Sequence, residues 1–269
     1  MNYIFIDGSY FIFYRYFALI QWWKKVHVEE PLDHLIDNDE FCNKFISRCK
    51  DSIKEIKKKL KSPKDTMIYI AFDCPRHTIW RTKIFNPYKA SRPNYNKESH
   101  LNPGPFFKLI YKSNIFQEIG CSILQEPELE ADDCIALTIK KIKTHENKCY
   151  IIASDHDYFQ ILESDKIMLY DLKFKQVNTE KNSFLDAKKD LFVKCVIGDK
   201  SDNISGIFPK NVGRKTADKY YEDKELFKKK CNTPQILQLY ARNKLLIDFN
   251  MIPNELQERF YENNVLSEL

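Results

Sequence analysis

The sequence lacks the cysteine and histidine spacing of a structural zinc site. Its eight cysteines contain no Cys-x-x-Cys pair, and its six histidines do not fall at zinc-finger spacing. Most of the cysteines stand in apolar runs, as in Cys149-Tyr-Ile-Ile and Phe192-Val-Lys-Cys195. Such runs are typical of reduced, buried thiols. We therefore expect a reducing compartment and neither a zinc finger nor a disulfide framework.

Long uncharged apolar runs are also missing. No segment reaches the length of a membrane span, and the start, Met1-Asn-Tyr-Ile-Phe-Ile-Asp7, meets a charge too early for a signal peptide. We expect a soluble, intracellular protein with no membrane partner. Its 269 residues, 43% of them hydrophobic, suffice for one large α/β domain with or without a small appendage. The formal net charge of +5 permits a nucleic-acid partner without demonstrating one.

Four short apolar runs rich in Ile, Tyr and Phe predict buried strands. They are Tyr3–Ile6, Thr66–Phe72, Cys149–Ala153 and Ile167–Tyr170. Apolar residues recurring every three or four positions predict an amphipathic helix between Phe41 and Leu60, with Asp37 and Glu40 as its capping pair. A second helix is expected from about Glu130 to Lys143. Strands alternating with helices indicate a mostly parallel sheet with helices on both faces.

Three of the predicted strands end beside an aspartate. These are Asp7 after the first strand, Asp73 after the second and Asp155 after the third. In open parallel sheets the working site lies outside the carboxyl ends of the strands. One aspartate there is ordinary turn chemistry, but three at the same edge predict a shared site.

A second set of acids opens the helix expected after Pro127. Glu130, Asp132 and Asp133 lie within four residues of one another. The helix dipole favours acids in a first turn, but three so close repel one another unless a cation lies between them.

A third set is Asp155-His-Asp157 followed by Asp199 and Asp202, and the last two share one face of a helical turn. Carboxylates without a His/Cys set favour Mg²⁺ or Mn²⁺ over zinc. Two such ions about 4 Å apart stabilise the attacking water and the leaving oxygen of an in-line displacement. His156 stands between two aspartates, and we interpret it as structural because alternation turns it away from them.

Five segments resemble, in the same order, the motifs of the 5′-nuclease family. That family comprises flap endonucleases, phage 5′ exonucleases and the amino-terminal nuclease of bacterial DNA polymerase I, and the bacterial and phage branch is the most similar. The segments are Phe5-Ile-Asp7-Gly-Ser, Ala71-Phe-Asp73, Glu130-Ala-Asp132-Asp133, Ser154-Asp155-His-Asp157 and Gly198-Asp199-Lys-Ser-Asp202-Asn203. The likeness runs from Asp7 to about Tyr221.

The resemblance implies a PIN-like, resolvase-type catalytic core at residues 1–190, with an arch region at about 80–105. Residues 191–269 are then a helical region of helix-hairpin-helix type that binds DNA. The implied activity is a metal-dependent 5′-3′ exonuclease or flap endonuclease of DNA replication or repair. Its partner is DNA with a 5′ single-stranded end or flap, with an RNA–DNA hybrid left open, and we expect a monomer.

We assign the acids to two ions. The first ion is expected among Asp7, Asp73, Glu130 and Asp132, and the second among Asp155, Asp157, Asp199 and Asp202, with Asp133 near the boundary. Water attacks the phosphodiester in this scheme.

A basic stretch follows Asp73. From Arg76 to Lys97 there are six basic residues and no acidic ones, so this stretch carries a charge of +6. Aromatic residues are interleaved with the basic ones. This composition predicts an electrostatic track for phosphates with rings on which bases stack. Tyr88-Lys89-Ala-Ser-Arg92 resembles a family motif whose lysine reaches the scissile phosphate and whose tyrosine stacks on a base, and Arg81 resembles the arginine before it.

A glycine-containing hairpin follows Asn203 and leads into a helix. Between Gly206 and Lys230 there are eight basic and four acidic residues. Backbone N–H groups at a helix start favour a phosphate, so the expected DNA contacts are Gly206, Lys210, Gly213, Arg214 and Lys215. In the family this element often holds K⁺. The turn here is longer, which leaves open whether it binds K⁺. Asn211 is expected in the left-handed position that a glycine normally fills.

The residues leave two rival functions open. A PIN-type RNase uses fewer acids and lacks the hairpin element. A non-catalytic protein that binds DNA structures on the same fold would be expected to have lost some of the carboxylates. Cleavage assays on flap DNA, an RNA–DNA hybrid and single-stranded RNA discriminate among the three.

Overall fold

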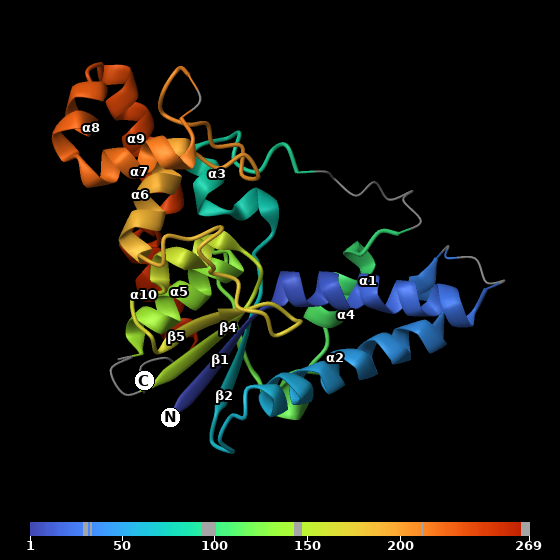
Figure 1. Ribbon diagram of the computed structural model, residues 1–269. Helices are drawn as coiled ribbons and strands as arrows, with labels where there is room; N and C mark the ends of the chain where they lie inside the picture. The colour runs from blue at the N-terminus through green and yellow to red at the C-terminus, as the bar shows by residue number, and fades with distance from the viewer. Residues whose placement is uncertain (29–31, 33, 93–100, 143–146, 211, 265–269) are drawn as a thin grey trace.

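A parallel five-stranded sheet forms the centre of the protein (Figure 1). The computed structural model describes residues 1–28, 32, 34–92, 101–142, 147–210 and 212–264. The strand order is β3-β2-β1-β4-β5. The strands are β1 (Asn2–Asp7), β2 (Met67–Ala71), β3 (Ser122–Leu124), β4 (Lys148–Ile152) and β5 (Ile167–Tyr170). All four pairings are parallel, so the carboxyl ends of the strands meet at one edge.

Helices cover both faces of the sheet, as predicted. Because side chains alternate along a strand, Ile4 and Ile6 face one layer while Tyr3 and Phe5 face the other. The first layer is α1 (Gly8–Val26), α2 (Asp39–Lys59) and α4 (Gly104–Tyr111). The second is α5 (Ala131–Lys141) with α10 (Asn254–Asn263). Each layer packs an aromatic-rich core against the sheet.

The predicted elements are present with small shifts in their bounds. All four strands and both helices form, but α2 is capped by Asn38, whose side chain accepts from the Phe41 backbone N–H at 2.9 Å. The predicted capping pair of Asp37 and Glu40 was therefore wrong by one residue. The sequence patterns missed β3, which has three residues, and α1, in which Trp23 is almost fully buried.

The carboxyl-terminal region is helical and packs partly on the core. It contains α6 (Ala187–Ile197), α7 (Arg214–Glu222), α8 (Lys224–Lys230) and α9 (Pro234–Ile247). Figure 1 shows these helices grouped beyond the carboxyl edge of the sheet. From α10, Leu256 and Phe260 return to the core beneath α5. In the described ranges, no helix has the length and apolarity needed to cross a bilayer.

Candidate metal centre

The aspartates at the strand ends meet at the carboxyl edge of the sheet. Asp7 ends β1, Asp73 lies two residues beyond β2, and Asp155 lies three residues beyond β4. Parallel pairing of β1 with both β2 and β4 brings them together. The helix α1 starts at once after Asp7, and a Cβ atom on Gly8 would lie 2.5 Å from the Ala71 carbonyl oxygen. A residue without a side chain is therefore needed where β1 turns into α1 beside β2.

Neutral donors hold the first two of these carboxylates. Asp7 accepts from the Tyr10 backbone N–H at 2.9 Å and from the Tyr158 hydroxyl at 3.1 Å. Asp73 accepts from the Ala131 backbone N–H at 2.8 Å and from the Ser9 hydroxyl. Both side chains are thus oriented by groups without charge.

The three acids at the start of α5 do not all face the same way. Glu130, Asp132 and Asp133 offer oxygens within 4.8 Å of one another. Only Glu130 and Asp132 line the cavity described below, whereas Asp133 is fully buried. Both oxygens of Asp133 are 2.7 Å from the guanidinium of Arg81. The structure therefore places Asp133 behind the site, where it holds Arg81.

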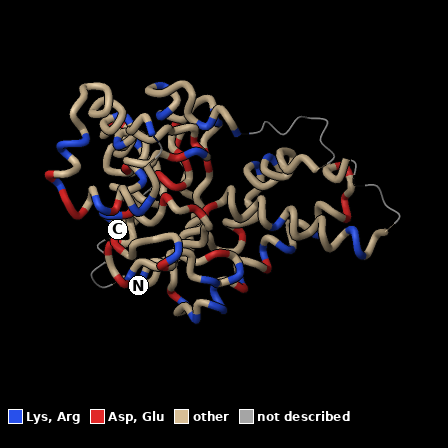
Figure 2. The backbone as a smooth tube through the Cα atoms, turned by 45° about the horizontal axis from the view of Figure 1, so that its top comes forward, with Lys and Arg blue, Asp and Glu red and all other residues tan. Residues whose placement is uncertain are grey.

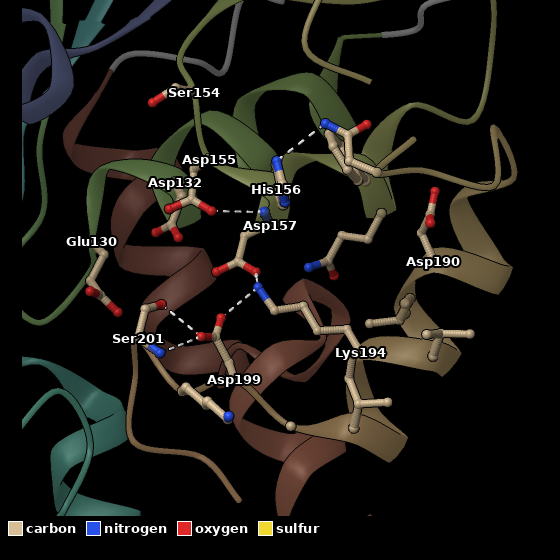
Figure 3. A pocket seen from close by; sticks show the side chains of 18 of the residues that line it. Glu130, Asp132, Ser154, Asp155, His156, Asp157, Asp190, Lys194, Asp199 and Ser201 are labelled. Carbon is tan, nitrogen blue, oxygen red and sulfur yellow. Dashed lines mark hydrogen bonds and ion pairs between the residues drawn. The ribbon is translucent and has the colours of Figure 1, made fainter. Parts of the chain in front are cut away.

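A second group of acids gathers around α6. Asp157, Asp199 and Asp202 offer oxygens within 4.8 Å of one another. The Nζ atom of Lys194 is 2.7 Å from Asp199 Oδ2 and contacts Asp157 Oδ1 (Figure 3). Burial raises the pKa of Asp199, but the Lys194 ammonium and the hydrogen bonds from the Ser201 hydroxyl and backbone N–H together outweigh burial and lower that pKa to about 2. This group therefore already contains a cation.

One cavity of about 590 Å³ joins the two groups. Acidic segments from several stretches of the chain meet in the middle of the molecule (Figure 2). Among the predicted acids, the cavity is lined by Asp7, Asp73, Glu130, Asp132, Asp155, Asp157 and Asp199. The described structure leaves Asp133 and Asp202 outside this lining. His156 also lines it, with its ring stacked on Phe159 at 4.7 Å.

The residues present fit a divalent cation. In the described part of the chain, no lysine or arginine forms an ion pair with Asp7, Asp73, Asp132 or Asp155. Burial, together with the Asp73 carboxylate, raises the pKa of Asp7 to about 7. Burial also raises the pKa of Asp132 well above its ordinary value, and Glu130 adds to the rise. A hard divalent cation among these oxygens would offset that repulsion.

The basic stretch after Asp73 does not form the open track that its composition predicted. Arg81 is buried and also donates to Glu130 at 3.0 Å. Lys83 pairs with Glu128, and Lys89 contacts Glu130. Four of the six basic residues pair with acids, the fourth being Arg92, and Lys97 lies outside the described residues.

Tyr88 is placed differently from the stacking ring that the resemblance implied. The residue is 5% exposed, and its hydroxyl donates to Glu130 at 2.9 Å and to Asp202 at 3.0 Å. A ring so buried offers no face to a base. Arg92 donates to Asp202 at 2.6 Å, while Lys89 and Arg92 still line the cavity. Most of the expected arch region, residues 93–100, lies outside the described residues.

The hairpin element connects α6 to α7 and reaches the same cavity. Gly198 ends α6 with a φ of +77°, and a Cβ there would lie 2.4 Å from the Ile204 carbonyl oxygen. Asp199 and Ile204 then pair across a tight turn. Gly213 caps α7, and Arg214 beside it lines the cavity.

The other residues expected at the hairpin lie at its surface. Lys210 and Lys215 are exposed and Gly206 is partly buried. Asn211, which was expected in the glycine position of the turn, lies outside the described residues. Of the predicted hairpin contacts in the described part of the chain, only Arg214 therefore shares the cavity with the acids.

Three residues of the site escaped the sequence reasoning. Lys194 stands in α6 between two buried residues, Ser9 lies two residues after Asp7, and Tyr158 lies three residues after Asp155. Hydroxyl and ammonium groups carry no local pattern that marks them as partners of distant acids. Only the serine had a signal, since it lies in the Phe5-Ile-Asp7-Gly-Ser segment.

Comparison with known proteins decides the family. A profile of the 5′-3′ exonuclease N-terminal resolvase-like domain matches residues 2–190. The chain belongs to this 5′-3′ exonuclease family. The family assignment agrees with the order of the acidic motifs and with the parallel sheet.

Individual relatives of this 5′-3′ exonuclease family member are distant. Ribonuclease H of Enterobacteria phage T4 is 26% identical over 223 residues, which cover 77% of this chain and 72% of that protein. The 5′-3′ exonuclease of Halalkalibacterium halodurans is 29% identical over 158 residues, 56% of this chain. That match spans half of the relative's length.

Solved structures share the fold along the whole chain. The bacteriophage T5 D15 flap endonuclease, in a complex with DNA and metal ions, aligns with a TM-score of 0.69 and 17% identity over 100% of both chains. T5 5′-exonuclease with bound zinc ions aligns with a TM-score of 0.65, also at 17% identity, over 98% of both chains. At these identities the likeness shows a common fold.

Proposed function

We propose that the protein is a metal-dependent 5′-3′ exonuclease and flap endonuclease that hydrolyses phosphodiester bonds in DNA. One observation carries the proposal: Asp7, Asp73, Asp132 and Asp155 converge on one cavity without a basic partner among the described residues. Family membership and the DNA and metal ions in the T5 D15 complex support it. The metal is expected to be Mg²⁺ or Mn²⁺, because the ligands are carboxylates.

When bound, divalent ions supply charge stabilisation for the phosphate and lower the pKa of the attacking water. The chain's own residues orient the acids. Tyr158 and Tyr10 fix Asp7, and Ser9 and Ala131 fix Asp73. Such preorganisation reduces the reorganisation needed when charge develops in the transition state.

Basic residues at the cavity would bind the substrate backbone. Lys89, Arg92 and Arg214 line the same cavity as the acids and come from two different segments. In our proposal the first two approach the scissile phosphate, and the hairpin with Gly206, Lys210, Gly213 and Lys215 binds the adjoining duplex. Binding of K⁺ by the hairpin is a further part of the proposal, and a measurement of K⁺ binding to the full chain tests it.

Cleavage of a 5′-labelled flap substrate in Mg²⁺ tests the proposal, and the cut position reports the balance of exonuclease and endonuclease action. We expect Asp73→Asn and Asp155→Asn to lose cleavage by at least about a hundredfold, because each removes a charge from the site. Both variants should still bind DNA. The matched control is Asp51→Asn, on the exposed surface of α2. Full activity of either site variant, or cleavage that persists in EDTA, contradicts the proposal.

RNA in a hybrid is a second candidate substrate. The phage T4 relative is named a ribonuclease H, which favours including an RNA–DNA hybrid in the assay. A PIN-type RNase would instead prefer single-stranded RNA, and a non-catalytic binding protein would cut none of the three substrates.

We also expect a monomer, which sedimentation of the full chain measures.

A further inference from the structure

The two acid groups of the cavity differ in how their charge is balanced. Asp157 and Asp199 share the ammonium of Lys194, which contacts the first and lies 2.7 Å from the second. The Lys194 side chain is only 19% exposed, and Asp157 and Asp199 are 16% and 14% exposed. This ion triad is therefore well shielded from solvent. Charges in such a shielded interior interact more strongly than charges at a surface.

The place of Lys194 in the last turn of α6 brings its side chain to the two carboxylates. Lys194 lies on α6 between Val193 and Cys195, both buried in the helical core. Its carbonyl accepts from the Gly198 backbone N–H at 2.8 Å, and the helix ends there, one residue before Asp199. Figure 3 shows the side chain extending from α6 to meet both carboxylates at its tip. The ammonium is thus held by the same helix end that positions Asp199.

In the other acid group Glu130 pairs with Arg81 and Lys89, but the remaining three acids are held by neutral donors. Asp7 and Asp73 accept from hydroxyl and backbone N–H groups, and Asp132 accepts from the Asp133 backbone N–H at 2.8 Å. No described lysine or arginine forms an ion pair with these three. A divalent cation meets no resident cation among them.

We infer that Lys194 is the built-in cation of the Asp157–Asp199 group and competes there with the second divalent ion. The inference rests on the proposed function, since it concerns the same site. An ion entering this group must displace the ammonium or tolerate its repulsion. The protein therefore binds one divalent ion at the Asp7–Asp73–Asp132 group and a second one much more weakly. Lys194 is a positioning residue that sets metal stoichiometry.

Mn²⁺ binding to the full chain tests the inference. Electron paramagnetic resonance of free Mn²⁺, combined with calorimetry, gives the number of ions and the affinity of each. In the native protein we expect the second ion to bind at least about tenfold more weakly than the first, which requires only a small part of the repulsion between nearby charges. Lys194→Met should tighten the second ion at least about tenfold and leave the first unchanged.

Two further variants separate charge from packing. Lys194→Gln removes the charge but keeps an N–H donor for the carboxylates, so it should behave like Lys194→Met even where the methionine variant folds poorly. Lys194→Arg keeps the charge and should retain a weak second site. The matched control is Lys188→Met, at an exposed position of the same helix, which should bind Mn²⁺ like the native protein.

The outcomes distinguish this inference from the proposed function. If the glutamine variant binds the second ion no more tightly than the native protein, while the first ion binds and flap DNA is cut, the role of Lys194 is overturned and the nuclease stands. If the native protein binds two ions with equal affinity, the inference is likewise overturned. If neither protein binds Mn²⁺ and neither cuts DNA, both proposals fail together.

Discussion

Arg81 and Asp133 form a two-pronged ion pair in the interior, with Nη1–Oδ2 and Nη2–Oδ1 distances of 2.7 Å. Their side chains are 2% and 0% exposed. Trp80 adds an N–H bond of 3.1 Å to the same carboxylate, and Arg81 also donates to the Leu246 carbonyl at 2.7 Å. The pair therefore joins three segments behind the metal centre: α3 (Trp80–Ile84), the start of α5 and the end of α9.

Removing the guanidinium should destabilise the fold. Arg81→Met leaves the Asp133 carboxylate buried without its counter-charge, which typically costs about 3–5 kcal/mol of unfolding free energy. Urea denaturation of the metal-free protein measures the loss. Arg48→Met, at an exposed position on α2, should change it by less than about 0.5 kcal/mol. Equal stabilities for the two variants would show that the pair contributes nothing to the fold.

The hydroxyl of Tyr88 should matter more than its ring. Tyr88→Phe keeps the buried ring but removes the donor to Glu130 and Asp202. We expect unfolding free energy to fall by about 1–3 kcal/mol, as is usual when a buried polar group loses its partner. A ring that stacks on a base would be fully replaced by phenylalanine. Unchanged stability together with unchanged DNA binding would therefore favour stacking over the hydrogen bonds.

The metal-free protein should lose stability as the pH rises through about 7. Burial and Asp73 raise the pKa of Asp7 to about 7, above its ordinary value of 3.8. The folded state then holds a proton that the unfolded chain has already released, so stability declines from about pH 4 up to about pH 7. Thermal unfolding in EDTA at pH 5 and pH 8 measures this slope.

Two comparisons check the origin of that slope. Asp7→Asn should flatten it, whereas Asp51→Asn should not. Saturating Mg²⁺ should stabilise the protein more at pH 8 than at pH 5, because protons and metal compete for the same oxygens. A slope that survives in Asp7→Asn assigns the pH dependence to other groups.

Exposed lysines of the hairpin should control duplex binding through their charge. Lys210→Ala and Lys215→Ala should weaken binding of all duplex sequences alike and each lower the salt slope by about 1. Fluorescence anisotropy at several salt concentrations gives both quantities. Lys58→Ala, exposed near the end of α2, is the control and should bind as the native protein does. A salt slope unchanged by both hairpin substitutions would place the duplex elsewhere.

Sequence reasoning reached the sheet and the common edge because those features have local patterns. Short apolar runs ending in aspartate predict parallel strands whose carboxyl ends meet, and the pairing of β1 with β2 and β4 confirms it. The pattern failed for β3, because three residues are too few to show alternation. It also failed for α1, which has aromatic residues on its buried and its partly exposed sides.

The sequence by itself determined which acids are present, the order of their motifs and the edge at which the strand-end aspartates gather. Only the tertiary structure decided which acids face the cavity and which cations accompany them. Asp133 and Asp202 turn toward Arg81 and Tyr88, while Lys194 enters the second acid group. The reason is physical: each strand is marked by the apolar side chains of neighbouring residues, whereas most of these contacts join groups tens of residues apart, wherever folding brings them together in a shielded interior.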